Sequence, residues 1–306
     1  MKQKICSVTM LIIFAFVSPD FSRPTIKGDN GWFSFSPEYK LEASVFGMND
    51  WLDAPAGKHG FLQFQNEKLV FEDGTTTKLW GTNICSRLPY VSAAKADSFA
   101  DFLCHYGNNA VRFHKFSRHA YRENISTDLD PDKFDRFDYF QSKLREKGIY
   151  YGWSHIYGHR VLPGDSSRML AYSEIKNLSY PWSHLNGSTS SLVNFAPDLQ
   201  ELSIELTVNM LNHVNPYTGL RYADDPGLAF VEFQNEDNIF WSAIGRSLEQ
   251  APTYRDLLNK QFSEWLLKKY GSQFELEKVW GKDNIPDGES LEKQNIFPDP
   301  NHGLFT

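Results

Sequence analysis

Polar side chains that can carry protons or hydrogen bonds follow the apolar runs of this sequence. The sharpest case is Glu236, which stands directly after Asn235 at the end of the apolar run 228–234. A carboxyl group at the rim of a buried strand loses hydration, which raises its pKa and suits it to general acid chemistry. A helix cap or first-turn carboxylate is the alternative, because Asp237 and Asn238 would serve equally well there.

Three more apolar runs carry polar residues at or near their carboxyl ends. These residues are Asn83, Arg112, His114 and His155. The carboxyl ends of parallel strands converge on one face of a barrel, and active sites lie on that face. A single such residue marks no more than the start of a turn, but four strands with the same arrangement favour a functional site.

The elements that must position these residues alternate between strand and helix. The predicted strands are residues 78–84, 110–116, 149–156 and 228–234, and the predicted helices are residues 92–106, 132–147, 197–214 and 254–270. This alternation predicts a parallel sheet with helical crossovers, either doubly wound or closed into a barrel. No glycine-rich nucleotide-binding motif follows the first strand, which argues against the nucleotide-binding version.

Two further segments flank or interrupt this pattern. Residues 61–71 predict a β-hairpin with its turn at Asn66 and Glu67. Residues 157–196 form a long excursion rich in Ser, Gly, Asn and aromatic residues, including Trp182. Loops of this length are usually functional or disordered, and the aromatic content favours an ordered loop over the active face.

Composition excludes some classes of partner. The chain has 306 residues and a net charge of −7, without a basic run, so nucleic acid is not an expected partner. An acidic surface also gives no attraction to anionic membranes. Aromatic residues reach 15 %, enough to fill a core or to line a cleft that stacks on apolar ring faces.

The first 24 residues predict a secretory signal peptide. Lys2 and Lys4 precede an apolar run at residues 8–17, which is too short to span a bilayer. The mature protein is therefore expected to be secreted or periplasmic; a buried N-terminal segment of a cytosolic protein is the alternative. The three cysteines, Cys6, Cys85 and Cys104, indicate no disulfide framework.

Several motifs together resemble a known family. They are Leu79-Trp80-Gly81-Thr82-Asn83-Ile84, Asn109-Ala110-Val111-Arg112-Phe113-His114, Asn215-Pro216-Tyr217-Thr218-Gly219-Leu220, Asp225-Pro226, Phe230-Val231-Glu232-Phe233-Gln234-Asn235-Glu236, Trp265-Leu266, Lys269-Tyr270-Gly271 and Val279-Trp280-Gly281. Over residues 61–285 the chain resembles clan A retaining glycoside hydrolases, most closely the family 5-like, cellulase-type (β/α)8 barrels. The motif set is specific for the clan and says little about the substrate.

The resemblance implies a role for each matched residue. Glu236 would be the general acid/base, Asn235 would hydrogen-bond the sugar 2-hydroxyl, and Arg112 would lie beneath the nucleophile and keep it ionised. Such enzymes cleave a β-linked poly- or oligosaccharide through a covalent glycosyl-enzyme, which requires a second carboxylate about 5 Å from the first. No cofactor is implied. The candidate substrate-binding residues are Asn83, His114, His155, Trp182 and Trp241.

The sequence departs from the family in one respect. The family's nucleophile is a Glu that ends the seventh strand, whereas only four strand–helix units are predicted here, and a full barrel takes about 250 residues. Glu289 and Glu292 follow no apolar strand. We therefore expect a C-terminally truncated barrel whose nucleophile lies beyond residue 306. The expected organisation is a signal peptide (1–24), a loop and hairpin segment (25–74) and a partial barrel domain (75–306).

Two other functions stay open at this point. One is a catalytically inactive carbohydrate-binding barrel or fragment that keeps an aromatic cleft. The other is a metal-dependent hydrolase acting on a different substrate through His114 or His155. The absence of an H-E-x-x-H motif argues against the metal-dependent alternative.

Overall fold

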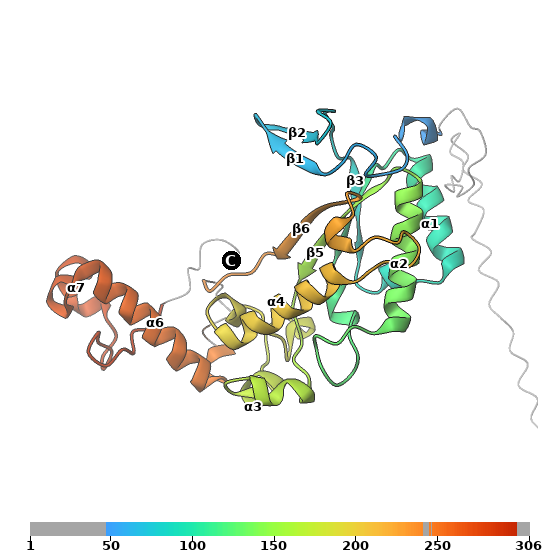
Figure 1. Cartoon of the computed structure of the whole chain (residues 1–306). Helices are drawn as coiled ribbons and strands as arrows, with labels where there is room; N and C mark the ends of the chain where they lie inside the picture. Colours follow the sequence, from blue (N-terminus) through green and yellow to red (C-terminus); the bar gives the residue numbers. More distant parts are fainter. Residues whose placement is uncertain (1–46, 241–244, 246, 299–306) are drawn as a thin grey trace, which may run out of the picture. The chain divides into compact units, whose positions relative to one another are not determined.

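The computed structural model describes residues 47–240, 245 and 247–298. The predicted signal peptide, part of the segment 25–74, and Trp241 lie outside these residues. The centre of the fold is a parallel four-stranded sheet in the order β3-β4-β5-β6 (Figure 1). Its strands are β3 (Gly81–Cys85), β4 (Ala110–His114), β5 (Tyr150–Ile156) and β6 (Leu228–Gln234). The α/β class and the parallel sheet predicted from the alternating pattern are confirmed, with four βα units present.

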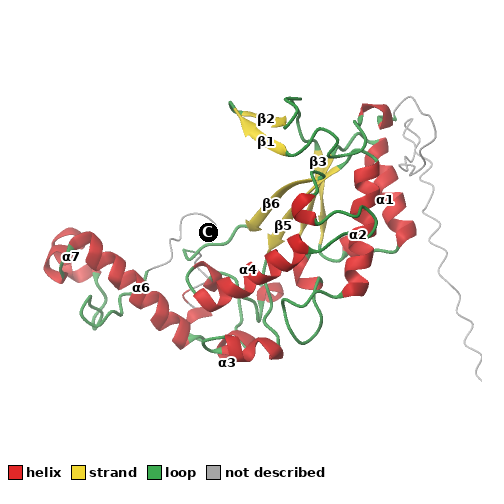
Figure 2. Ribbon diagram, in the orientation of Figure 1, coloured by secondary structure: helices red, strands yellow, loops and turns green. Residues whose placement is uncertain are grey.

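Helices connect these strands and extend beyond them (Figure 2). They are α1 (Ala93–His105), α2 (Pro131–Glu146), α3 (Tyr172–Lys176), α4 (Pro197–Asn212), α6 (Pro252–Tyr270) and α7 (Gln273–Trp280). Local chemistry fixes the ends of α2. The Asp130 side chain accepts hydrogen bonds from the backbone N–H groups of Asp132 and Lys133, with Pro131 at the first helical position. Gly148 follows the helix in a left-handed conformation, with φ of 77°.

The hydrophobic core lies between one face of the sheet and helices α1 and α2. Val111, Phe113, Tyr151 and Trp153 alternate along β4 and β5 and are buried in this core. Aromatic residues of α2 fill the layer opposite: the rings of Phe113 and Phe137 lie 5.5 Å apart. Because side chains alternate along a strand, residues such as Arg112 and His114 point to the opposite face.

A buried polar network ties α2 to β5 and to the segment after α4. The Tyr222 hydroxyl donates to Asp138 over 2.6 Å, and the Nε2 atom of His213 lies 2.6 Å from the same carboxylate. Gln141 donates to the Tyr222 hydroxyl and accepts from the indole N–H of Trp153. Each of these network side chains therefore has a hydrogen-bond partner, as a low-dielectric interior requires.

The predicted hairpin is also confirmed. Strands β1 (Leu62–Gln65) and β2 (Lys68–Phe71) pair antiparallel around Asn66 and Glu67, which both have positive φ, as a type I′ turn demands. The ring of Phe71 stacks on that of Tyr150, the first residue of β5, at a centroid separation of 5.1 Å. The hairpin thus packs against the amino-terminal end of the sheet, away from the polar strand ends.

The excursion at residues 157–196 is ordered, as expected, and holds α3 and short 3-10 turns of its own. Its apolar residues form a second core with the first turns of α4 and α6; this core includes Ile175, Leu178, Leu185, Leu192, Leu199 and Tyr254. The segment was expected to be a loop without helices, so the presence of α3 and the 3-10 turns corrects that expectation. The short helices could not be recognised in the sequence, because each is too short to show the helical period of apolar residues.

Two smaller findings concern the remaining expectations. Cys85 and Cys104 are both free thiols, and Cys104 is buried. Within the described ranges, no helix combines the length and the apolar content that crossing a membrane requires.

Candidate active site

The strand register places the predicted polar residues on one face of the sheet. Asn83 pairs with Arg112, and His114 pairs with Ser154 on the neighbouring strand. Ser154 in turn pairs with Glu232 of β6. All of these side chains point away from α1 and α2, and we call this surface the inner face. Because the strands are parallel, their carboxyl ends bring residues from four separate parts of the chain together.

Arg112 is the centre of the inner face. Its Nε and Nη2 atoms donate to the Oε2 atom of Glu232 over 3.0 and 2.6 Å. Nη2 also donates to Ser154 over 2.9 Å and to the Oδ1 atom of Asn235 over 2.6 Å. The planar guanidinium presents its N–H groups in a rigid fork, with one Nη2 hydrogen shared between two acceptors, and a lysine ammonium lacks this fork. Arg112 therefore fixes the side chain immediately before Glu236.

Glu232 was not among the residues singled out from the sequence. It lies in the middle of β6 and is the carboxylate that pairs with Arg112 in this structure. The alternation within residues 228–234 could have indicated it, because Phe230, Glu232 and Gln234 must share a face. Its partner lies 120 residues away, however, and no local pattern reveals that pairing.

The backbone turns sharply after three of the parallel strands. Ser86 follows β3, Lys115 follows β4 and Glu236 lies two residues beyond β6, with φ values of 61°, 58° and 43°. Side chains other than glycine rarely adopt positive φ, and such positions cluster at functional sites. Each turn ends the strand abruptly and directs the residue it carries to the edge of the inner face.

Asn235 and Glu236 have contrasting environments. Asn235 is buried and bonded to Arg112, whereas Glu236 is exposed. The expectation that the Glu236 carboxyl lies against a low-dielectric core is therefore wrong for this structure, because the left-handed turn carries it out of the strand into solvent. The carboxylate remains free to meet a ligand at the mouth of the site.

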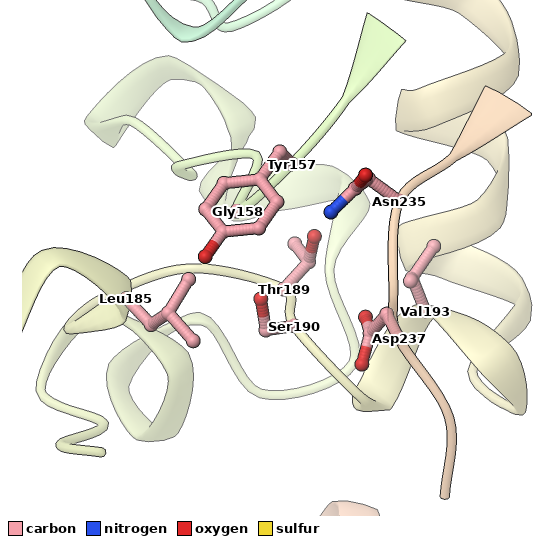
Figure 3. A pocket seen from close by; sticks show the side chains of 8 residues that line it. All are labelled: Tyr157, Gly158, Leu185, Thr189, Ser190, Val193, Asn235 and Asp237. Atoms are coloured by element: carbon pink, nitrogen blue, oxygen red, sulfur yellow. The ribbon is translucent and has the colours of Figure 1, made fainter. Parts of the chain in front are cut away.

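One polar atom of Asn235 has no partner. Its Nδ2 atom is buried without a hydrogen bond, and so is the Oγ1 atom of Thr189. Both residues line a cavity of about 10 Å³, and in Figure 3 the Asn235 amide nitrogen points toward Tyr157 and Thr189, while the Tyr157 ring extends toward Leu185. A buried donor without a partner is costly, so this amide is poised to bind a hydroxyl or a water molecule.

Asp237 anchors the excursion to the end of β6. It accepts hydrogen bonds from the backbone N–H and the hydroxyl of Ser191 and from the side-chain amide of Gln234. Burial raises the pKa of Asp237, and these donors oppose that shift. Asp237 therefore holds the wall of the site in place, which is a structural role.

His114 belongs to the inner face, as predicted. Its Nδ1 atom lies 2.9 Å from the Ser154 hydroxyl, and burial followed by the charges of Arg112 and Lys115 lowers its pKa to about 4. At neutral pH the ring is uncharged, with one nitrogen able to donate and the other to accept. That suits the recognition of a hydroxyl group.

The structure places His155 elsewhere. It points to the helix-packed side of the sheet, where its ring is fully buried near Phe116 and neither ring nitrogen has a partner. Successive side chains of a strand point to opposite faces, so Ser154 lies on the inner face and the next residue, His155, lies on the other.

The other two predicted substrate-binding residues are also placed. Asn83 lies 3.4 Å from Arg112 and so belongs to the site, while Trp182 is 44 % exposed on the excursion.

An aromatic pair continues the site beyond His114. The rings of Tyr157 and His184 stack at 5.8 Å with an interplanar angle of 5°, and the Tyr157 hydroxyl lies 2.9 Å from the Nε2 atom of His184. The ammonium group of Lys115 lies 4.1 Å from the centre of the Tyr157 ring. Neither residue was singled out from the sequence: Tyr157 directly follows β5 but opens the excursion, and His184 lies inside it.

Among the described residues, no group of three or more His, Cys, Asp or Glu side chains is arranged to hold a metal ion. The side chains that cluster here are instead an arginine, two amides, a histidine and two carboxylates. These can bind hydroxyl groups, hold charge and transfer protons.

No protein-family model and no curated protein matches this chain. Several solved structures to which it is similar are glycoside hydrolases. A family 5 mannosidase from Rhizomucor miehei matches at 13 % identity over 64 % of this chain and 54 % of its own, with a TM-score of 0.43. An endo-1,4-β-mannanase from the same organism matches at 14 % identity over 78 % and 67 %, with a TM-score of 0.40.

An endo-β-1,4-mannanase from Thermotoga petrophila also matches, at 18 % identity over 64 % of this chain, with a TM-score of 0.37. This chain spans 41 % of that structure's length.

Proposed function

We propose that this chain provides the acid/base half of a glycoside hydrolase that cleaves β-linked poly- or oligosaccharides with retention of configuration. The observation that carries the proposal is the bond from Arg112 to Asn235, which fixes the backbone ahead of Glu236 at the carboxyl ends of parallel strands. The motif resemblance over residues 61–285 supports the same assignment.

Each residue has a role in this proposal. The Glu236 carboxyl group protonates the departing glycosidic oxygen and later deprotonates the incoming water. The unpartnered amide of Asn235 donates to a sugar hydroxyl next to the reacting carbon. Neutral His114 and the Tyr157 ring bind the adjacent sugar through a hydroxyl contact and a stacking contact.

The nucleophile is a separate matter. Glu232 lies on the inner face, but its Oε2 atom accepts two hydrogen bonds from Arg112, and we assign it to holding that arginine and not to the covalent step. We therefore propose that the second carboxylate comes from a segment encoded beyond residue 306, and that Arg112 keeps it ionised in the complete barrel. Downstream coding sequence with a further apolar strand ending in Glu is the expected finding; a stop codon directly after Thr306 would contradict it.

The substitution Glu236→Gln tests the catalytic role in the protein that contains the second carboxylate. Hydrolysis of an activated aryl β-glycoside is assayed together with binding of a β-linked hexasaccharide. We expect the rate to fall by about 10²- to 10⁴-fold, the usual contribution of a general acid/base, with binding retained. Glu123→Gln, at an exposed carboxylate outside the site, is the matched control. A Glu236→Gln variant that keeps more than half of the parent rate would sink the assignment.

The pairing of Glu232 with Arg112 also favours a second function for the 306-residue chain alone. Among the described residues, Glu236 is the one inner-face carboxylate that is not paired. This chain would therefore bind glycan without completing a double displacement, which needs two carboxylates. Saccharide binding without turnover of any aryl glycoside is the result that would support this carbohydrate-binding function.

A further inference from the structure

Four basic side chains gather beside the inner face of this acidic protein. They are Arg87, Lys115, Arg118 and Arg160, and we call them the basic cluster. Arg87 follows β3, Lys115 and Arg118 follow β4, and Arg160 follows β5, so the fold brings them to the same strand ends as Arg112. None of the four forms an ion pair with a carboxylate of the described residues.

Direct contacts connect two members of the basic cluster, Arg118 and Lys115, to the site. The Nε atom of Arg118 lies 3.3 Å from the Nε2 atom of His119, and its Nη1 atom donates to the backbone carbonyl of His184 over 3.4 Å. The His184 ring stacks on Tyr157, over which Lys115 lies. Tyr157 in turn meets His114 edge-on at 5.5 Å.

The charges act on one another. Burial lowers the pKa of Arg118, and the nearby Arg160 and Arg87 lower it further. The pKa of His119 falls to about 4, through burial and through the charges of Arg118, Arg87, Lys133 and Arg160. Of these cations Lys133 is paired, with Asp130 at 3.0 Å. Mutual repulsion of this kind destabilises the folded state unless an anion relieves it.

The surroundings indicate what kind of anion would bind. Arg87 and Arg160 are exposed, and Arg118 and Lys115 are half-buried, so all four can be reached from solvent. The stacked Tyr157 and His184 rings, with Trp182 two residues before His184, offer flat surfaces among the charges. Arginine forks bind planar or tetrahedral oxyanions through paired hydrogen bonds, and aromatic rings bind the apolar faces of sugars.

We propose that the basic cluster is a subsite for a sugar bearing an anionic group, so that the glycan this protein binds is a polyanion such as a polyuronate or a sulfated polysaccharide. The proposal rests on the proposed function for its location and adds the substrate class. A carboxylate or sulfate on a ring held near Tyr157 would meet Arg118 and Arg160, while the next sugar would reach Arg112 and Glu236.

Isothermal titration of the full chain with three hexasaccharides tests this. The ligands are an oligomannuronate, a sulfated galactan oligomer and mannohexaose as the neutral probe. We expect at least one anionic ligand to bind at least tenfold more tightly than mannohexaose, with an affinity that falls between about 50 and 300 mM NaCl as screening increases. Comparison of the affinities for the oligomannuronate and the sulfated galactan oligomer identifies whether carboxylate or sulfate is preferred.

Two variants and a control locate the binding. Arg118→Gln and Arg160→Gln should each weaken binding of the anionic ligand by about 10- to 100-fold, the range for a hydrogen bond to a charged group, and leave mannohexaose unaffected. Arg160 is exposed, so its variant stays informative if the Arg118 variant misfolds. Arg122→Gln, at an exposed arginine 3.7 Å from Asp128, should change neither affinity.

The outcomes separate this inference from the proposed function. Equal affinity for charged and neutral hexasaccharides, equal loss of both in the variants, or no binding of any of the three overturns the anionic subsite. Hydrolysis of neutral glycosides by the complete barrel together with that result would leave the proposed function standing. Arginine-dependent binding of an anionic glycan by a protein that hydrolyses no glycoside would support the subsite and count against the catalytic role.

Discussion

The Nη2 atom of Arg112 lies 2.6 Å from the Oδ1 atom of Asn235, which joins the second parallel strand to the residue before Glu236. The same nitrogen holds Glu232 and Ser154. One side chain thus sets the relative positions of β4, β5 and β6 at the end where their polar residues meet. Its removal should affect the site before it affects the fold.

Arg112→Lys tests this relationship. A lysine keeps the charge but lacks the rigid fork that orients Glu232, Ser154 and Asn235 around one group, so Asn235 loses its fixed orientation. We expect binding of the β-linked hexasaccharide to weaken by about tenfold and the free energy of unfolding to fall by about 1–3 kcal/mol, from the lost hydrogen bonds to a charged group. Titration calorimetry and urea denaturation measure the two effects, with Arg122→Lys as control. Unchanged binding would mean that Asn235 is held by other contacts.

Asp138→Ala should destabilise the fold without altering the site. The carboxylate is buried and accepts from the Tyr222 hydroxyl and from His213, both of which lose their partner in the variant. We expect a loss of about 3 kcal/mol in the free energy of unfolding, from stranded buried polar groups. Asp138→Asn should cost less because one acceptor remains. Asp256→Ala, at an exposed position of α6, should change stability by less than about 0.5 kcal/mol.

Stability should fall in mild acid because of two fully buried histidines. Burial lowers the pKa of His155 from 6.5 to about 3 and that of His159 from 6.5 to about 4. The unfolded chain binds these protons near pH 6.5 and the folded chain does not, so the stabilisation is complete above pH 6.5 and is lost as pH falls toward 4. The loss at pH 5 is about 2 kcal/mol for each histidine.

His155→Leu should flatten this acid dependence. Denaturation at about pH 7 and about pH 5 is compared for the parent and the variant, and the difference between the two pH values should shrink in the variant. Because His155 faces away from the inner face, hexasaccharide affinity should stay unchanged. Weaker saccharide binding in His155→Leu, with an unaltered melting temperature, would restore the substrate-binding role expected from the sequence.

Gly81→Ala should disturb the pairing of β3 with β4. A Cβ atom at this position would lie 2.3 Å from the backbone carbonyl oxygen of Ala110, which cannot rotate away as a side chain would. We expect destabilisation of about 1–3 kcal/mol, the range for overpacking. Thr82→Ala, at the adjacent exposed position, is the control, and urea denaturation of both variants is the measurement. Equal stability of the two variants would show that the strand pair shifts freely.

The sequence predicted the elements well because their patterns are local. Residues 228–234 coincide with β6, and the helix predicted at residues 254–270 begins two residues earlier in the structure, at Pro252. Asn83, Arg112 and Asn235 also come together as expected. The signal lies in apolar spacing, glycine after helices and polar residues at strand ends, all visible within one element.

What the sequence could not predict depends on contacts between elements. Glu232 belongs to the site because it pairs with Arg112, and Tyr157 belongs to it because its ring contacts His184 and Lys115. His155 and Ser154 are neighbours, and the strand register decides which of them reaches the inner face. Glu236 is exposed because its backbone has a left-handed conformation. A glutamate in the sequence gives no indication of that conformation, whereas a glycine would.

The order of the sheet, β3-β4-β5-β6, is also the order of the strands along the chain. When each new strand leaves the ribosome, the neighbouring strand with which it pairs has therefore already been synthesised. Loop closure stays limited to one crossover at a time, which keeps the entropy cost of each addition low. Such a sheet can assemble vectorially during translation, with Arg112 of β4 presented first and Glu232 of β6 arriving last to pair with it.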